Sequence, residues 1–119
     1  MRGDSVTGVN GTTVKTMTSL EVAREASISY RTLDYLVRTH LVEPTVDARG
    51  SGSARRWSAE DVALVVVAAR IMHAVGGGYR PIVEDALDQL RRLPLTWWPE
   101  TLTLDVTEDV TLTVKCRAV

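Results

Sequence analysis

Hydrophobic residues recur every three or four positions in several stretches of this 119-residue chain, which is the spacing of helices with one buried side. The first stretch, residues 20–26, follows Thr18 and includes Glu21, and these two residues form the pattern of a capping box. The second, residues 30–39, follows Ser29, a residue type that favours the N-cap position. We therefore predict two short helices joined by a tight break.

Two longer helices are predicted further along the chain. In residues 62–75, preceded by Ser58 as a cap, only Arg70 and His73 are strongly polar, and a helix that is apolar nearly all round must be buried on more than one side. The fourth helix opens at Pro81 after three glycines that end the third. Its inward stripe consists of Val83, Ala86, Leu87 and Leu90.

Alternation of apolar and polar residues indicates strands near the end of the chain. Residues 102–106 and 110–114 place Leu or Val at every second position with Thr or Asp between them, which predicts a hairpin. A second hairpin is predicted around residues 48–54, because this Gly- and Ser-rich turn lies between short apolar pieces at residues 41–42 and 56–57.

The helix predicted over residues 30–39 has two chemically different sides. The side expected to face the core consists of Leu33, Leu36, Val37 and His40. The opposite side consists of Arg31, Asp34, Tyr35 and Arg38. Because the major groove of DNA is wide enough for a helix, and arginine binds guanine there in a bidentate manner, this pattern favours DNA binding.

Residues 18–72 resemble the winged helix-turn-helix of the MerR family. Residues 26–35, ASISYRTLDY, are similar to its helix-turn-helix signature, and residues 41–44 are similar to its exit into the wing. The glycine, arginines and tryptophan of residues 52–57 are similar to its wing return, and residues 58–62 to the cap of its next helix. The resemblance implies a DNA-binding protein that is not an enzyme.

Pattern and resemblance together predict a mostly α fold with small β: a winged helix-turn-helix followed by a helix and a C-terminal β-hairpin. Residues 1–17 are expected to form a flexible arm, residues 18–75 the DNA-binding domain, and residues 76–119 an element for dimerisation or partner binding. Two residues depart from the family, since Ser27 stands where glycine is common and Asp34 where a basic residue is frequent. The long antiparallel coiled-coil helix of larger regulators is missing, so their metal and drug sensing does not carry over.

Ten residues are expected to contact DNA. They are Ser29, Tyr30, Arg31, Tyr35, Arg38, Arg49, Ser51, Ser53, Arg55 and Arg56. We expect Arg31 to contact a base, Tyr35 and Arg38 to contact phosphates, and the wing residues to hold the backbone or the minor groove. The alternative is that Arg31 and Arg38 form a solvated helix face with ion pairs to Asp34.

Composition narrows the possible functions further. The net charge of −1 means that any positive surface is local, so one copy should bind DNA weakly. No apolar run approaches the roughly 20 residues needed to cross a bilayer, and the single Cys116 fits a reducing, cytoplasmic setting. Neither histidine has companion ligands and no nucleophile lies near a base in the pattern, so we expect no metal, no cofactor and no catalysis.

Weak binding by one copy implies a homodimer or a cooperative oligomer on double-stranded DNA. The candidate interfaces are the helix at residues 62–75, the pair Trp97 and Trp98, and the C-terminal hairpin; alternatively, the hairpin and tryptophans fold back within one chain. Three functions stay open: a transcriptional regulator of bacterial or phage origin, an excisionase-like architectural factor in recombination, and an antitoxin-like module whose hairpin binds a protein partner.

Overall fold

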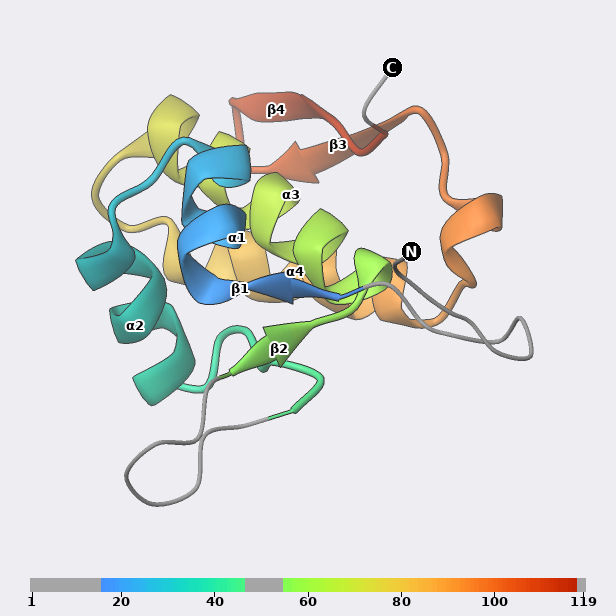
Figure 1. The fold of residues 1–119 in the computed structure, drawn as a ribbon. Helices are drawn as coiled ribbons and strands as arrows, with labels where there is room; N and C mark the ends of the chain where they lie inside the picture. The colour runs from blue at the N-terminus through green and yellow to red at the C-terminus, as the bar shows by residue number, and fades with distance from the viewer. Residues whose placement is uncertain (1–15, 47–54, 118–119) are drawn as a thin grey trace, which may run out of the picture.

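The computed structural model describes residues 16–46 and 55–117. Within these ranges the chain forms four α-helices and two small two-stranded sheets (Figure 1). In chain order the elements are β1 (Met17–Thr18), α1 (Ser19–Ala26), α2 (Tyr30–Arg38), β2 (Arg56–Trp57), α3 (Ala59–Val75), α4 (Arg80–Arg91), the 3₁₀ turn η2 (Leu95–Trp97), β3 (Thr101–Asp105) and β4 (Thr111–Lys115). The prediction of a mostly helical fold with small β elements and a C-terminal hairpin is confirmed.

Local capping explains where α1 and α2 begin. The Thr18 hydroxyl accepts the Glu21 N–H at 3.2 Å and the Glu21 carboxylate accepts the Thr18 N–H at 2.8 Å, which is the predicted capping box. Ser27 ends α1 in the left-handed conformation with φ 58°, and the Ser29 hydroxyl caps α2 by accepting the Thr32 N–H at 3.0 Å. The two helices are therefore separated by only three residues.

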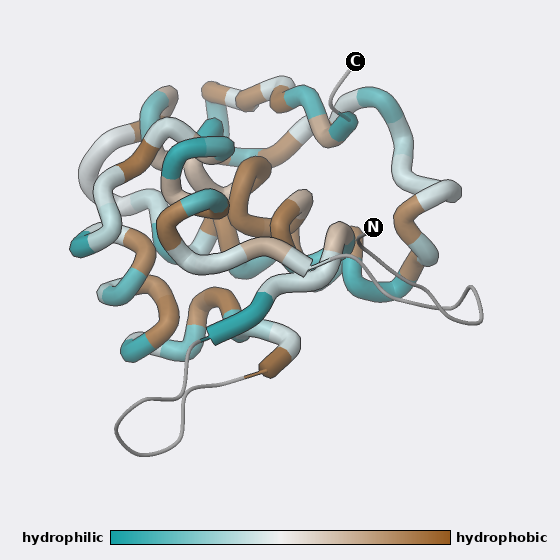
Figure 2. The backbone as a smooth tube through the Cα atoms, viewed as in Figure 1, coloured by the Kyte–Doolittle hydropathy of each residue, from teal (hydrophilic) through white to brown (hydrophobic). Residues whose placement is uncertain are grey.

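Helix α3 forms the centre of the molecule. It packs against α1, α4, β2 and β4, as its nearly uniform apolar sequence predicts, and Figure 2 shows its hydrophobic residues in the interior. The inward stripe predicted for α4 is also buried. The largest fully buried side chains are Trp57, Trp98, Leu33, Leu36, Ile71, Leu87, Leu90 and Leu104.

The C-terminal hairpin folds back onto the helices of its own chain. Leu102 lies opposite Val114, and Leu104 opposite Leu112, in an antiparallel register. Leu104 and Val114 are buried because β3 packs on α4 and β4 packs on α3. The alternative in which the hairpin and both tryptophans fold back within one chain thus holds for the hairpin and Trp98, but not for Trp97, which is 72% exposed. Leu104 and Val114 are covered, whereas Val110 beside the hairpin turn is 51% exposed.

The strand pairing of the middle segment differs from the prediction. We expected residues 41–42 to pair with residues 56–57, but β2 pairs with β1, and Val46 forms a single bridge to Arg56. Leu41 and Val42 are instead buried in the turn after α2, where the guanidinium of Arg91 donates to the Leu41 carbonyl at 3.2 Å. The predicted turn at residues 48–54 lies outside the described residues.

The predicted positions of His40 and Met17 also differ from the structure. His40 was placed on the buried side of α2, but it is exposed and adopts φ 64°, because the helix has ended and the chain reverses direction there. Met17 was placed in the N-terminal arm, but it belongs to strand β1. Residues 1–15 of that arm lie outside the described residues. Among the helices that the structure describes, none is long and apolar enough to cross a membrane.

Candidate nucleic-acid interface

The outward side of α2 carries polar and aromatic side chains at its start. Ser29, Tyr30 and Arg31 are exposed around the first turn, and Tyr35 follows on the next turn with 52% of its surface exposed. The N-terminal end of a helix has unpaired N–H groups and a partial positive charge, which favour an approaching anion. The Ser29 hydroxyl at this end is already hydrogen-bonded to the Thr32 hydroxyl, at a distance of 2.9 Å.

Asp34 joins the outer side of α2 to the start of β2. Its carboxylate accepts a hydrogen bond from Nη1 of Arg55 at 2.9 Å and forms an ion pair with Nε of Arg38 at 3.0 Å. Arg55 is largely enclosed, with 17% of its side chain exposed, whereas Arg38 is 70% exposed. The hydrogen bond from Arg55 and the positive charge of Arg38 lower the pKa of Asp34, so the carboxylate is ionised at neutral pH.

Arg56 points away from this junction, because successive residues of a strand project to opposite sides. Its Nε donates to the Thr16 hydroxyl at 3.0 Å and its Nη2 to the Thr16 carbonyl at 3.3 Å, so it fixes strand β1. The next residue, Trp57, is fully buried and donates its indole N–H to the Ser19 hydroxyl at 3.0 Å. Strand β2 is therefore anchored to both β1 and α1.

The structure brings together six of the ten residues expected to contact DNA. These are Ser29, Tyr30, Arg31, Tyr35 and Arg38 on α2, with Arg55 joined to them through Asp34. Arg56 lies at the β1 side, and Arg49, Ser51 and Ser53 fall outside the described residues. The alternative was that Arg31 and Arg38 form ion pairs with Asp34. Arg38 does form this ion pair, but within the described part of the chain no hydrogen bond or ion pair holds the side chain of Arg31.

Two features of the described residues keep the outward side of α2 accessible. Arg31 and Arg38 are exposed on this surface, and the carboxylate of Asp34 binds Arg38 and Arg55, in a chain whose net charge is −1. The β3–β4 hairpin packs on α3 and α4, and Figure 1 shows it on the opposite side of the molecule from α2. The hairpin therefore does not cover the outward side of α2.

Sequence reasoning missed the role of Asp34 as a junction. The spacing of Asp34 and Arg38, four residues apart on a helix, did predict their ion pair. Arg55 is 21 residues away from Asp34 along the chain, so no local pattern connects the two. The contact depends on how the segment after α2 returns to the helix, which only the three-dimensional structure gives.

Comparison with known proteins relates part of the chain to one class. No protein-family model matches the sequence. Over 48 residues, which are 40% of the chain, it is 44% identical to uncharacterised HTH-type transcriptional regulators from two strains of Mycobacterium tuberculosis and from Mycobacterium bovis. The match covers only 21%, about a fifth, of the length of these relatives. The chain thus has distant, partial homology to HTH-type transcriptional regulators, a class that is not enzymatic.

Proposed function

We propose that this chain binds double-stranded DNA as a transcriptional regulator, with residues 18–75 acting as a MerR-like winged helix-turn-helix. The observation that carries the proposal is the junction at Asp34, which holds the outer side of α2 and the start of β2 together. A helix and an adjacent loop strand presented on one surface can contact a duplex at two places. The partial homology to HTH-type regulators supports the same function.

In this proposal the first turn of α2 enters the major groove. Tyr30 and Arg31 lie at the tip of the helix, and the guanidinium of Arg31 can reach the edge of a guanine. Tyr35 and Arg38 are one and two turns further along, where the phosphates that border the groove would lie. The 70% exposure of Arg38 leaves its guanidinium accessible to a phosphate even while its Nε pairs with Asp34.

Arg55 receives a different role from the one that the sequence suggested. Its side chain is mostly enclosed and hydrogen-bonded to Asp34, so it acts as a positioning residue for the segment that precedes β2. DNA contacts from the wing would then come from Arg49, Ser51 and Ser53. Arg56, hydrogen-bonded to Thr16, stabilises the base of the same segment.

Selection of duplexes from a random pool tests the proposal directly. The full chain is expected to recover a consensus sequence and to bind it more weakly as salt increases, with a slope of log K against log salt of about −0.9 for each phosphate contacted. Binding with the salt slope but without a consensus would favour the architectural alternative. Recovery of no duplex above background would contradict DNA binding altogether.

A further inference from the structure

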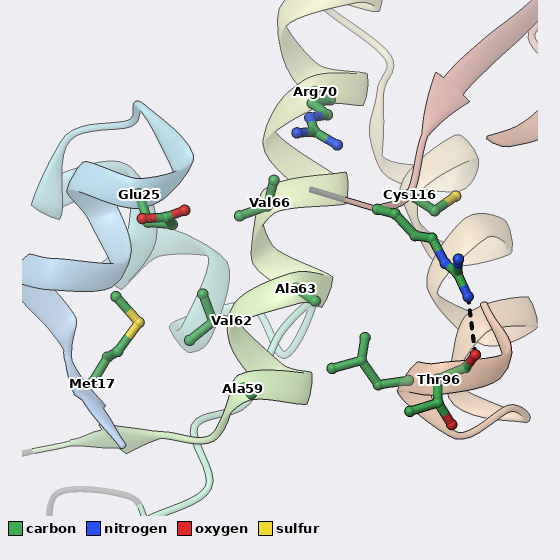
Figure 3. Close-up of a pocket in the computed structure, with 11 residues that line it drawn as sticks. Met17, Glu25, Ala59, Val62, Ala63, Val66, Arg70, Thr96 and Cys116 are labelled. Carbon is green, nitrogen blue, oxygen red and sulfur yellow. Dashed lines mark hydrogen bonds between the residues drawn. The ribbon is translucent and has the colours of Figure 1, made fainter. Parts of the chain in front are cut away.

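An apolar groove runs along one side of α3, at a distance from the DNA-binding surface proposed above. Its volume is about 590 Å³, and Ala59, Ala63 and Val66 form its floor with the spacing of one helix face (Figure 3). Glu25 of α1 stands on one wall and Thr96 of η2 on the opposite wall. Other sides of α3 pack against α1, α4, β2 and β4, and within the described part of the chain this stripe lines an open groove.

An exposed tryptophan is the chain neighbour of a residue that lines the groove. Trp97 follows Thr96 directly and has 72% of its surface exposed, whereas its neighbour Trp98 is buried. A large aromatic side chain left in water beside an open apolar groove is typical of a protein interface, where tryptophan is enriched. Leu104 and Val114 of the hairpin are buried, whereas Trp97 and the groove are accessible parts of the predicted interface among the described residues.

The two walls of the groove carry opposite charges. The groove surface is therefore complementary to the same surface on a second copy of the chain. Glu25 is exposed on the α1 wall. Arg117 lies on the other wall, where its Nη2 donates to the Thr96 carbonyl at 3.0 Å. A two-fold axis through the groove would place Glu25 of one copy against Arg117 of the other, twice in the same interface, as two-fold symmetry requires.

We propose that this groove is the interface between two copies of the chain, with the Trp97 side chain of each copy covering apolar groove surface of the other. The proposal rests on the proposed function, because it gives the regulator the second copy that a two-half-site operator needs. Figure 1 shows η2, in orange, on the opposite side of the molecule from α2. A dimer across the groove therefore leaves the outward sides of both α2 helices accessible to DNA.

A small organic anion is a less suitable occupant. Arg70 and Arg117 each donate to one main-chain carbonyl, that of Lys115 at 2.8 Å and that of Thr96 at 3.0 Å, and keep further N–H groups for a carboxylate, so these two residues do not decide between the occupants. The carboxylate of Glu25 on the facing wall would repel a second anion. A second copy satisfies both charges at once.

Charge reversal tests the interface with the full chain. Glu25→Arg and Arg117→Glu should each weaken dimerisation at least about tenfold in sedimentation equilibrium, because like charges then face each other at two symmetric contacts. The double variant E25R/R117E should regain most of the wild-type affinity. Trp97→Ser should also weaken the dimer. Asp88→Arg, on the exposed side of α4, and Arg92→Glu, at the exposed C-cap of that helix, serve as matched controls that leave it unchanged.

Two results would overturn the interface: a wild-type chain that is monomeric at every concentration, or a double reversal that is no better than the single variants. Circular dichroism establishes that each variant is folded, which is expected since all the substituted side chains are exposed. Binding of each variant to a single half-site separates this proposal from the proposed function. A variant that is a folded monomer and still binds a half-site would support both the interface and the DNA-binding function. If the wild type does not bind a half-site, that result counts against the DNA-binding function and not against the interface.

Discussion

At the scale of single residues, Asp34 has the most consequences for the proposed interface. Its carboxylate holds Arg38 on its own helix and Arg55 from the strand side, so one residue sets the positions of two guanidinium groups. A neutral residue there would remove the ion pair between Asp34 and the largely enclosed Arg55. The contact also makes the stability of this region depend on pH.

The substitution Asp34→Asn should remove part of that pH dependence. The pKa of Asp34 is lowered in the folded chain, chiefly by the hydrogen bond from Arg55, so its stabilising effect is present above the usual aspartate pKa of about 4 and is lost as the pH falls through the lowered pKa. Urea unfolding between neutral pH and pH ~3 should show a smaller loss of stability on acidification for the variant than for the wild type.

Glu21 requires a separate control, because the N–H and hydroxyl of Thr18 lower its pKa in the same direction. Glu21→Gln should remove its own share of the pH dependence and leave the share of Asp34 in place. If Asp34→Asn and the wild type lose stability equally on acidification, then the junction at Asp34 does not contribute to folding.

At the scale of elements, the turn between α1 and α2 depends on a backbone conformation that suits glycine. Ser27 has φ 58°, a region that costs residues with a Cβ atom about 1–2 kcal/mol. Ser27→Gly removes this cost from the folded state. Glycine also raises the conformational entropy of the unfolded chain, which lowers the stability of the fold by about 0.4–1 kcal/mol. We expect Ser27→Gly to raise the free energy of unfolding by about 0.5 kcal/mol relative to Ser27→Ala, measured by urea denaturation. A glycine variant less stable than the alanine variant would contradict the assigned conformation.

Strand β2 and helix α1 are tied by the hydrogen bond from Trp57 to Ser19. The Ser19 hydroxyl is the buried polar group among the described core residues, so Trp57→Phe leaves it without its donor and should cost about 2 kcal/mol of stability. Ser19→Ala leaves the indole N–H unpaired and should be destabilising for the same reason. The double variant lacks both hydrogen-bonding partners. Its decrease in the free energy of unfolding should therefore be about 1 kcal/mol smaller than the sum of the decreases in the two single variants. Additive losses would show that this bond does not hold the two elements.

The elements that could be predicted from the sequence are those with a local signal. The capping box at Thr18, the cap at Ser29 and the apolar spacing of the helices depend on neighbours three or four residues apart, so their positions followed from the pattern. The two-residue strand β2 carries no such period, and its partner Met17 is 40 residues away. The apolar pair Leu41 and Val42 was misplaced because a short buried turn and a short strand have the same composition.

At the scale of the whole molecule, the C-terminal half closes the core and leaves the outward side of α2 exposed. The hairpin and Trp98 cover α3 and α4, which accounts for the apolar character of α3 within a single chain. The outward surface of α2 stays outside this packing, with Arg31 and Arg38 exposed on it. The helical part of the candidate site could therefore be predicted from the two-sided pattern of α2, whereas the separate directions of Arg55 and Arg56 could not.

The central claim is that the outward side of α2 recognises bases through Arg31, and the affinity of Arg31→Ala for a selected duplex tests it most directly. Fluorescence anisotropy should show binding weakened by about 10- to 100-fold on the selected duplex and far less on an unrelated duplex, the equivalent of losing one bidentate contact. Arg92→Ala, at the C-cap of α4, should bind both duplexes like the wild type. An Arg31→Ala variant that keeps full affinity and full preference for the selected duplex would contradict the account.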